Sequence, residues 1–163
     1  EIASDATEYD GTDASPYQCE GDQLIYDTFR DVTQGNKTVT ITCLPFEKRT
    51  LRNDYFDMAI TSPPYFDTEK YLGGEQSRET SANYEQWRDT FYLILIQKTF
   101  DALKAGGIFC LQVGSQRYPL LTDGTEIAKE AGFEVLEVRP TEMVNNQTKT
   151  DEDKGEVVII LRK

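Results

Sequence analysis

Segments with strand character alternate along this chain with segments of helical periodicity, and this alternation limits the possible folds more than any other feature. The run KTVTITCL alternates and is rich in β-branched residues, so a strand is expected over about 38–43. Apolar runs predict two further strands, YFDMAIT at about 55–61 and IFCLQVG at 108–114. Such alternation favours an α/β fold with a mostly parallel sheet.

The first helix is expected over about 16–34. Ser15 is a suitable N-cap, and Pro16 fits the first helical position, where no backbone donor is needed. Apolar residues follow at helical spacing, and Gly35 suits a C-terminal cap.

Two more helices are expected further along the chain, after a polar, glycine-rich loop over 73–83. The longer one begins at Tyr84 and should carry Lys104 in its last turn, with Gly106 or Gly107 just beyond. A short helix over about 124–131 should end at Gly132.

Two strand-like runs, FEVLEVR at 133–139 and EVVIILR at 156–162, are separated by a polar segment. This arrangement predicts a C-terminal hairpin, with one antiparallel strand at the edge of the sheet.

Composition restricts the chemistry. The chain has 163 residues, which fits one domain, and no apolar run approaches the roughly 20 residues needed to span a bilayer. It has no histidine, and its three cysteines, Cys19, Cys43 and Cys110, are widely spaced. We therefore expect no metal site, no disulfide framework and a reducing, cytoplasmic location. The net charge of −12 disfavours a free-standing nucleic-acid binder.

The strand over 55–61 ends in TSPPY, where two prolines stop any ladder of backbone hydrogen bonds. In open α/β sheets, ligands bind beyond the carboxyl ends of the strands, which is where this tetrapeptide falls. A plain Ser-Pro-Pro turn is the alternative interpretation.

Ser62, Pro63, Pro64 and Tyr65, with the strand before them and FDTEKY after them, resemble motif IV of the S-adenosylmethionine-dependent amino-methyltransferases of DNA. The longer string resembles bacterial and phage-type DNA methylases, including those of restriction-modification systems. The resemblance implies a Rossmann-like class I methyltransferase fold, and a catalytic role for these four residues in transferring a methyl group to N4 of cytosine or N6 of adenine. A DNA target would be flipped out of the duplex.

The resemblance also implies cofactor-binding residues at two other strand ends. Asp13 matches the acidic position that binds the ribose hydroxyls, although it could equally start the turn capped by Ser15. The segment CLPFE would lie against the adenine ring of the cofactor, through Leu44, Pro45, Phe46 and Glu47, unless Phe46 is a core residue. Gly114 and Ser115, at the tip of the next strand, would border the pocket.

The family's aromatic-X-Gly-X-Gly turn, motif I, is not found before Asp13, and no target-recognition domain is visible. We therefore expect a single, partial catalytic domain over 1–163 that lacks the first strand. This fragment alone should bind S-adenosylmethionine weakly and be inactive. A partner subunit or a further domain would then recognise the DNA.

Two alternatives remain open from the sequence. One is a methyltransferase that acts on RNA or on protein glutamine, where related tetrapeptides occur. The other is an inactive, methyltransferase-like remnant that serves as an interaction module, which the acidic charge favours.

Overall fold

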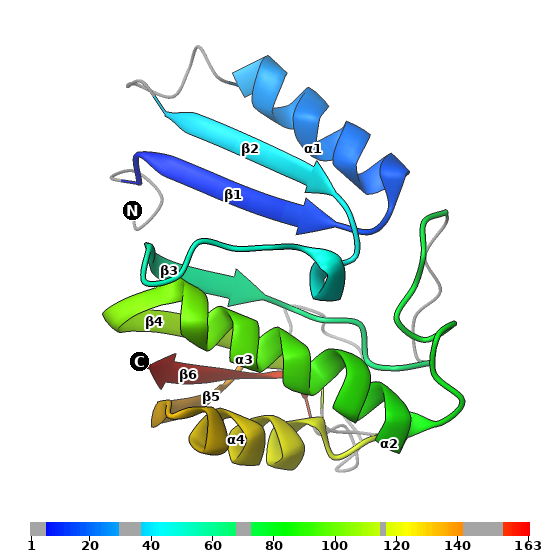
Figure 1. Cartoon of the computed structure of the whole chain (residues 1–163), viewed down its shortest axis with the longest axis vertical. Coiled ribbons are helices and arrows are strands. Elements are labelled where there is room, and N and C mark those ends of the chain that lie inside the picture. The colour runs from blue at the N-terminus through cyan, green and yellow to red at the C-terminus, as the bar shows by residue number, and fades with distance from the viewer. Residues whose placement is uncertain (1–5, 30–36, 68–72, 115–116, 142–154) are drawn as a thin grey trace. The chain divides into compact units, whose positions relative to one another are not determined.

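The computed structural model describes residues 6–29, 37–67, 73–114, 117–141 and 155–163. The chain divides into two compact units (Figure 1). Unit 1 comprises Glu1–Arg49 and Lys70–Thr80, and unit 2 comprises Thr50–Glu69 and Ser81–Lys163. Residues 30–34 of the first predicted helix, and Ser115, lie outside the described residues.

Unit 1 is built on two parallel strands. Strand β1 (Glu8–Asp13) pairs with β2 (Thr38–Cys43) in a register that places Asp13 opposite Cys43. Helix α1 (Pro16–Phe29) connects them and packs against both, and a short 3-10 helix, η1 (Phe46–Lys48), follows β2. The prediction of a strand over 38–43 is confirmed.

The start of α1 is also as predicted. The buried Ser15 accepts a 3.0 Å hydrogen bond from the backbone N–H of Cys19 through its carbonyl, which closes the first helical turn. Its hydroxyl accepts a longer one, 3.5 Å, from the N–H of Gln18. Pro16, with no N–H to leave unsatisfied, therefore occupies the first helical position.

Unit 2 contains a four-stranded sheet in the order β3-β4-β6-β5. Its strands are β3 (Phe56–Thr61), β4 (Leu103–Val113), β5 (Glu134–Pro140) and β6 (Val157–Arg162). Strands β3 and β4 are parallel, whereas β6 is antiparallel to both of its neighbours, β4 and β5. The mostly parallel α/β class with a C-terminal antiparallel hairpin is confirmed.

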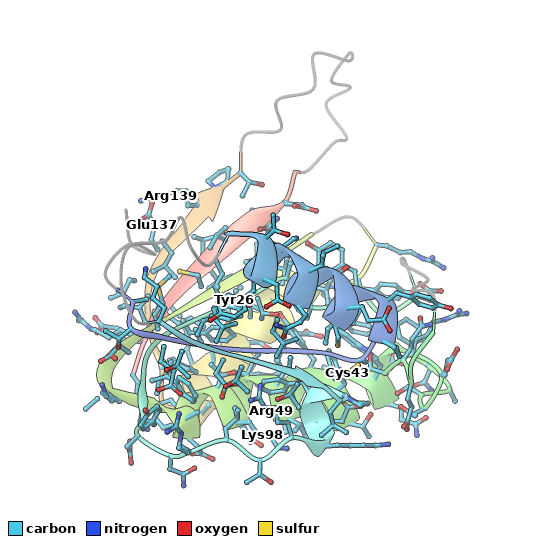
Figure 2. The ribbon with its side chains drawn as sticks, turned by 90° about the horizontal axis from the view of Figure 1, so that it is seen from above. Tyr26, Cys43, Arg49, Lys98, Glu137 and Arg139 are labelled. Carbon is cyan, nitrogen blue, oxygen red and sulfur yellow. The ribbon has the colours of Figure 1, made fainter. Side chains whose placement is uncertain are left out.

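The predicted place of the antiparallel strand was wrong, because β6 lies inside the sheet and β5 lies at its edge. The side chains explain this order. Ile159 and Leu161 of β6 are fully buried, whereas β5 is mostly exposed and carries an ion pair between Glu137 and Arg139 on its surface (Figure 2). A strand with an apolar inner face gains more from a central position than a charged one does.

The predicted end of the long helix was also wrong. Helix α3 (Leu93–Ala102) stops before Leu103, and the segment to Gly107, including Lys104, belongs to β4. Leu103 is extended and fully buried, and the N–H of Gly106 donates a 2.7 Å hydrogen bond to the carbonyl of Lys163. Pairing with the end of the chain therefore wins over the helical propensity of this segment.

The other helices of unit 2 are α2 (Tyr84–Trp87), η2 (Arg88–Tyr92), which is a π-helical turn, and α4 (Leu120–Ala131). Helix α4 begins four residues before the predicted position, because its buried first residue, Leu120, accepts a 3.0 Å hydrogen bond from the hydroxyl of Tyr92. The predicted cap at Gly132 is confirmed by its left-handed conformation, with φ of 110°.

Helices α3 and α4 contact each other and lie on one face of the unit 2 sheet (Figure 1). Trp87 of α2, Tyr92 of η2, and Phe109 and Leu111 of β4 are among the fully buried side chains of unit 2. Among the described residues, no helix is both long and apolar enough to cross a bilayer.

Candidate functional site

The tetrapeptide Ser62-Pro63-Pro64-Tyr65 directly follows the last residue of β3, Thr61. Ser62 is exposed, and its hydroxyl oxygen lies 3.4 Å from that of Tyr65, close enough for either group to donate a weak hydrogen bond. Pro63 is buried, whereas Pro64 and Tyr65 are half-buried. One proline therefore anchors the loop while the polar and aromatic groups on either side of it stay accessible.

The next residue, Phe66, adopts a left-handed backbone conformation with φ of 56°, which is uncommon for a bulky side chain. Its buried ring lies in an aromatic cluster, with its centroid 5.3 Å from that of Tyr118, 6.0 Å from Trp87 and 6.2 Å from Tyr84. Burial of this ring compensates for the backbone strain, which is of the order of 1–3 kcal/mol for such a residue. The chain reversal after the tetrapeptide is thus held from inside the unit.

Asp67 holds the same turn from its polar side. Its Oδ1 accepts a 2.8 Å hydrogen bond from the hydroxyl of Tyr118 and lies 3.0 Å from the guanidinium of Arg117. Sequence reasoning did not identify Phe66, Asp67 or Tyr118 as supports of the site. Their partners are about 20 to 50 residues away in the chain, and no local pattern could have revealed them.

Strands β3 and β4 are parallel, so their carboxyl ends meet at one edge of the sheet. Gly114 directly follows β4 and lies against the ring of Tyr65, since a Cβ atom built on Gly114 would be 2.9 Å from Cε2 of that ring. Gly114, which the sequence placed at the border of the pocket, therefore lies beside one of the predicted catalytic residues.

In unit 1, the predicted cofactor residues lie at the carboxyl ends of β1 and β2. Asp13 is the last residue of β1, and its carbonyl accepts a 3.0 Å hydrogen bond from the N–H of Leu44. Its carboxylate Oδ1 accepts a 2.7 Å hydrogen bond from the N–H of Ser15. Asp13 thus shapes the turn into α1, as the alternative interpretation expected, and its second carboxylate oxygen adds further acceptor capacity.

The segment after β2 turns sharply. Pro45 is buried and precedes η1, whereas Leu44, Phe46 and Glu47 are half-buried. Phe46 is therefore not a fully buried core residue, and its ring contributes apolar surface near the end of β2.

Arg49 fixes this segment to β1, a role that the sequence did not indicate. Its guanidinium donates a 3.1 Å hydrogen bond to the carbonyl of Gly11 and forms an ion pair with Asp10. Both side chains are nearly buried, and Arg49 is labelled in Figure 2. Separating the two side chains would leave a nearly buried charge without its partner, which is costly. The ion pair therefore holds η1 close to β1.

The loop that follows Leu72 completes this end of unit 1. Gly74 has φ of 76°, and a Cβ atom there would lie 2.0 Å from the carbonyl oxygen of Ala14, so only glycine fits beside the turn that follows Asp13. An ion pair between Lys48 and Glu75 ties the same loop to η1.

The structure therefore brings the predicted residues together in two groups, one within each unit. Asp13 and Leu44–Glu47 share the end of the unit 1 sheet. Ser62–Tyr65 and Gly114 share the carboxyl end of β3 and β4 in unit 2. Among the described residues, no cluster of three or more acidic or cysteine side chains could hold a metal ion.

Comparison with known proteins identifies the fold. No protein-family model and no curated protein matches the chain. Among solved structures, an S-adenosylmethionine-dependent methyltransferase from Methanosarcina mazei is similar over 99% of this chain and 84% of its own, with a TM-score of 0.60 and 15% identity. The [4+2]-cyclase SpnF is similar over 99% of this chain and 68% of its own, with a TM-score of 0.61 and 16% identity.

A candidate DNA modification methylase from Thermus thermophilus, solved with S-adenosyl-L-methionine, matches 70% of this chain at 22% identity with a TM-score of 0.49. The chain spans about half the length of that protein, 50%. Taken together, the longer matches show that this chain has the fold of the S-adenosylmethionine-dependent methyltransferases. Since one protein with this fold is a cyclase, the reaction has to be argued from the site.

Proposed function

We propose that this chain is the catalytic part of an S-adenosylmethionine-dependent methyltransferase that methylates an exocyclic amine in DNA, N4 of cytosine or N6 of adenine. One observation carries the proposal. An exposed serine, two prolines and a half-buried tyrosine follow β3 at the carboxyl end of parallel strands, in a chain with the methyltransferase fold.

The chemistry of the amine explains these residue types. The lone pair of an aromatic amine is delocalised into the ring, so the nitrogen is a poor nucleophile. Hydrogen bonds from the amine to the Ser62 hydroxyl and to a backbone carbonyl of the proline pair would draw the nitrogen toward tetrahedral geometry. This site works by positioning and polarity rather than by a strong base, which suits a chain without histidine.

Tyr65 offers a flat, partly accessible ring on which a flipped base can stack. Its hydroxyl lies near that of Ser62, so the two side chains would hold the base through its face and its amine together. Pro63 and Pro64 limit the loop's freedom, which reduces the entropy lost when the base is bound.

The unit 1 residues fit S-adenosylmethionine in chemical type. The Asp13 carboxylate can accept hydrogen bonds from ribose hydroxyls, and the half-buried Phe46 can pack against an adenine ring, with Leu44, Pro45 and Glu47 around it. When bound, this cofactor supplies an electrophilic methyl group. Asp13 and Phe46 would orient it, while Ser62 would orient the accepting amine.

A non-catalytic interaction module is the second candidate, and the net charge of −12 favours it. Phosphate neutralisation needs a basic surface, so a DNA methyltransferase of this charge would need a partner subunit or a further domain to bind the duplex. A methyltransferase that acts on RNA or on protein glutamine would differ from the proposed DNA methyltransferase only in the substrate that accepts the methyl group.

The test is transfer of a tritiated methyl group to DNA by the protein expressed from its complete coding sequence. Ser62→Ala should reduce the rate at least about 100-fold, the size of effect seen when one polarising hydrogen bond is removed. It should change the free energy of unfolding by no more than about 0.5 kcal/mol, because Ser62 is exposed.

Ser81→Ala is a suitable control, because Ser81 is half-buried, lies outside the tetrapeptide and has its hydroxyl oxygen 3.4 Å from that of Thr90. This variant should keep full activity. Equal rates for wild type and Ser62→Ala would contradict the proposed mechanism. No transfer to DNA by wild type, together with transfer to RNA or protein glutamine, would assign the alternative substrate, and no transfer at all would support the interaction module. Digestion of methylated DNA to nucleosides separates cytosine from adenine.

A further inference from the structure

The backbone conformation at position 114 does not require a glycine, although Gly114 occupies it. Unlike Gly106 and Gly132, it is not among the glycines with positive φ, so an alanine could adopt its conformation. The constraint is space, since an added Cβ atom would lie 2.9 Å from Cε2, 3.3 Å from Cδ2 and 3.6 Å from Cζ of the Tyr65 ring. One edge of that ring occupies the room that a side chain at 114 would fill.

This contact sets where the ring can lie. A second constraint on Tyr65 comes from its hydroxyl, which is 3.4 Å from the Ser62 hydroxyl. Carbon atoms in proteins rarely approach closer than about 3.5 Å, so a methyl group at 114 would push the ring away from the end of β4. Because the ring pivots about its Cβ atom, the hydroxyl and the plane of the ring would move as well.

We propose that Gly114 is a positioning residue for Tyr65. By leaving out a side chain at the end of β4, it fixes the plane on which the target base stacks and the distance between the stacked base and Ser62. The inference rests on the proposed function, because it assigns the base to the Tyr65 ring.

The contact itself can be tested without any ligand. In equilibrium unfolding of the full chain, Gly114→Ala should lower the denaturation midpoint of the wild-type protein. The same change should have much less effect in a Tyr65→Ala background, where the ring is absent. Gly21→Ala is the matched control, since a Cβ at Gly21, within α1, meets no atom within 4 Å. It should leave the midpoint unchanged or raise it.

The positioning role is tested by binding of a fluorescein-labelled thymidine decamer with one central adenine or cytosine. Tyr65→Ala should weaken binding of the preferred decamer about tenfold, the usual size of the loss when a stacking ring is removed. Gly114→Ala should produce a loss of similar size, and the double variant should bind no more weakly than Tyr65→Ala alone. Gly21→Ala should bind as wild type does.

Each other outcome has a distinct meaning. If wild type binds and Gly114→Ala binds equally well, Gly114 has no positioning role and the proposed function stands. If Gly114→Ala weakens binding as much in the Tyr65→Ala background as in wild type, it does not act through the ring and the inference is wrong. If the wild-type protein expressed from its complete coding sequence binds neither decamer, the proposed function fails and the role of Gly114 fails with it.

Discussion

The hydroxyl of Tyr84 donates a 2.7 Å hydrogen bond to Oδ2 of Asp123, which joins the first turn of α2 to α4. The Tyr84 ring stacks on Tyr118, with centroids 4.8 Å apart and planes inclined by 10°. Tyr118 in turn contacts the ring of Phe66 and binds Asp67. The helices are thus connected, through aromatic rings, to the loop that carries the candidate catalytic residues.

Removing the Tyr84 hydroxyl should weaken this connection. Tyr84→Phe keeps the stacked ring but leaves Asp123 without its 2.7 Å donor, so it should cost about 1–2 kcal/mol in the free energy of unfolding. Urea denaturation followed by circular dichroism measures this. Tyr17, which is exposed in α1, provides the control, and Tyr17→Phe should stay within about 0.5 kcal/mol. Equal stability of both variants would show that the bond to Asp123 contributes nothing.

Stability should fall at alkaline pH. Burial raises the pKa of Tyr92 well above its ordinary value of 10.0, and burial together with the hydrogen bond to Asp123 raises the pKa of Tyr84. Below pH 10 both phenols are neutral whether the chain is folded or unfolded, so their contribution to stability is fully present. Above pH 10 the unfolded chain releases protons that the folded chain retains, and stability is lost as the pH rises toward the folded-state pKa values.

For Tyr92 alone, the free energy of unfolding should fall by about 1.4 kcal/mol per pH unit above pH 10. Denaturant titrations between pH 8 and 11 measure the slope, and Tyr92→Phe should make it shallower by about that amount. Tyr17→Phe should leave the slope unchanged. A wild-type slope that Tyr92→Phe does not alter would contradict the direction of the pKa shift.

The cysteines of unit 1 should differ in reactivity. Cys19 is buried, and burial, aided by its hydrogen bond with Cys43, raises its pKa to about 12. Cys43, which is labelled in Figure 2, is exposed. Because thiolates are the reactive species, an aromatic disulfide reagent at pH 8 should modify Cys43 quickly and Cys19 slowly, at the rate of local opening.

Cys43→Ser should therefore abolish the fast phase, whereas Cys19→Ser should leave it in place. In denaturant, all three thiols of wild type should react together. Rapid modification of Cys19 in the folded Cys43→Ser variant would show that it is not protected by burial.

The two ion pairs beside η1 should differ in strength. Arg49→Gln leaves the nearly buried Asp10 without its guanidinium partner and should cost about 3 kcal/mol. Lys48→Gln removes an exposed pair with Glu75 and should cost no more than about 1 kcal/mol. Thermal unfolding of the two variants compares them directly. Similar losses for both would mean that burial of the Arg49 pair adds no stability.

The amino-acid sequence predicted those features that depend on neighbouring residues. The proline after Ser15 and the glycine at 132 mark helix ends through backbone geometry, and β-branched alternation marks β2. The end of β3 at Thr61 could be predicted because proline cannot continue a strand's hydrogen bonding. These signals act within a few residues, so they can be interpreted without knowing the fold.

The predicted helix boundaries were wrong where contacts with distant segments of the chain decide the local structure. Leu103–Gly107 has a helical pattern, but its place beside β3 and the end of the chain makes it a strand. Helix α4 begins early because Tyr92 holds Leu120. In both places, hydrogen bonds and burial supplied by remote residues exceed the small differences in local propensity.

By itself, the sequence determined the α/β class, most strand positions and the location of Ser62–Tyr65 at the end of β3. Only the tertiary structure decided that β6 lies inside its sheet, that Arg49 holds η1 to β1, and that Phe66 and Asp67 secure the turn after Tyr65. It also placed Gly114 against the Tyr65 ring. Each of these depends on which residues become neighbours after folding, and the free energy of such contacts is absent from the unfolded chain.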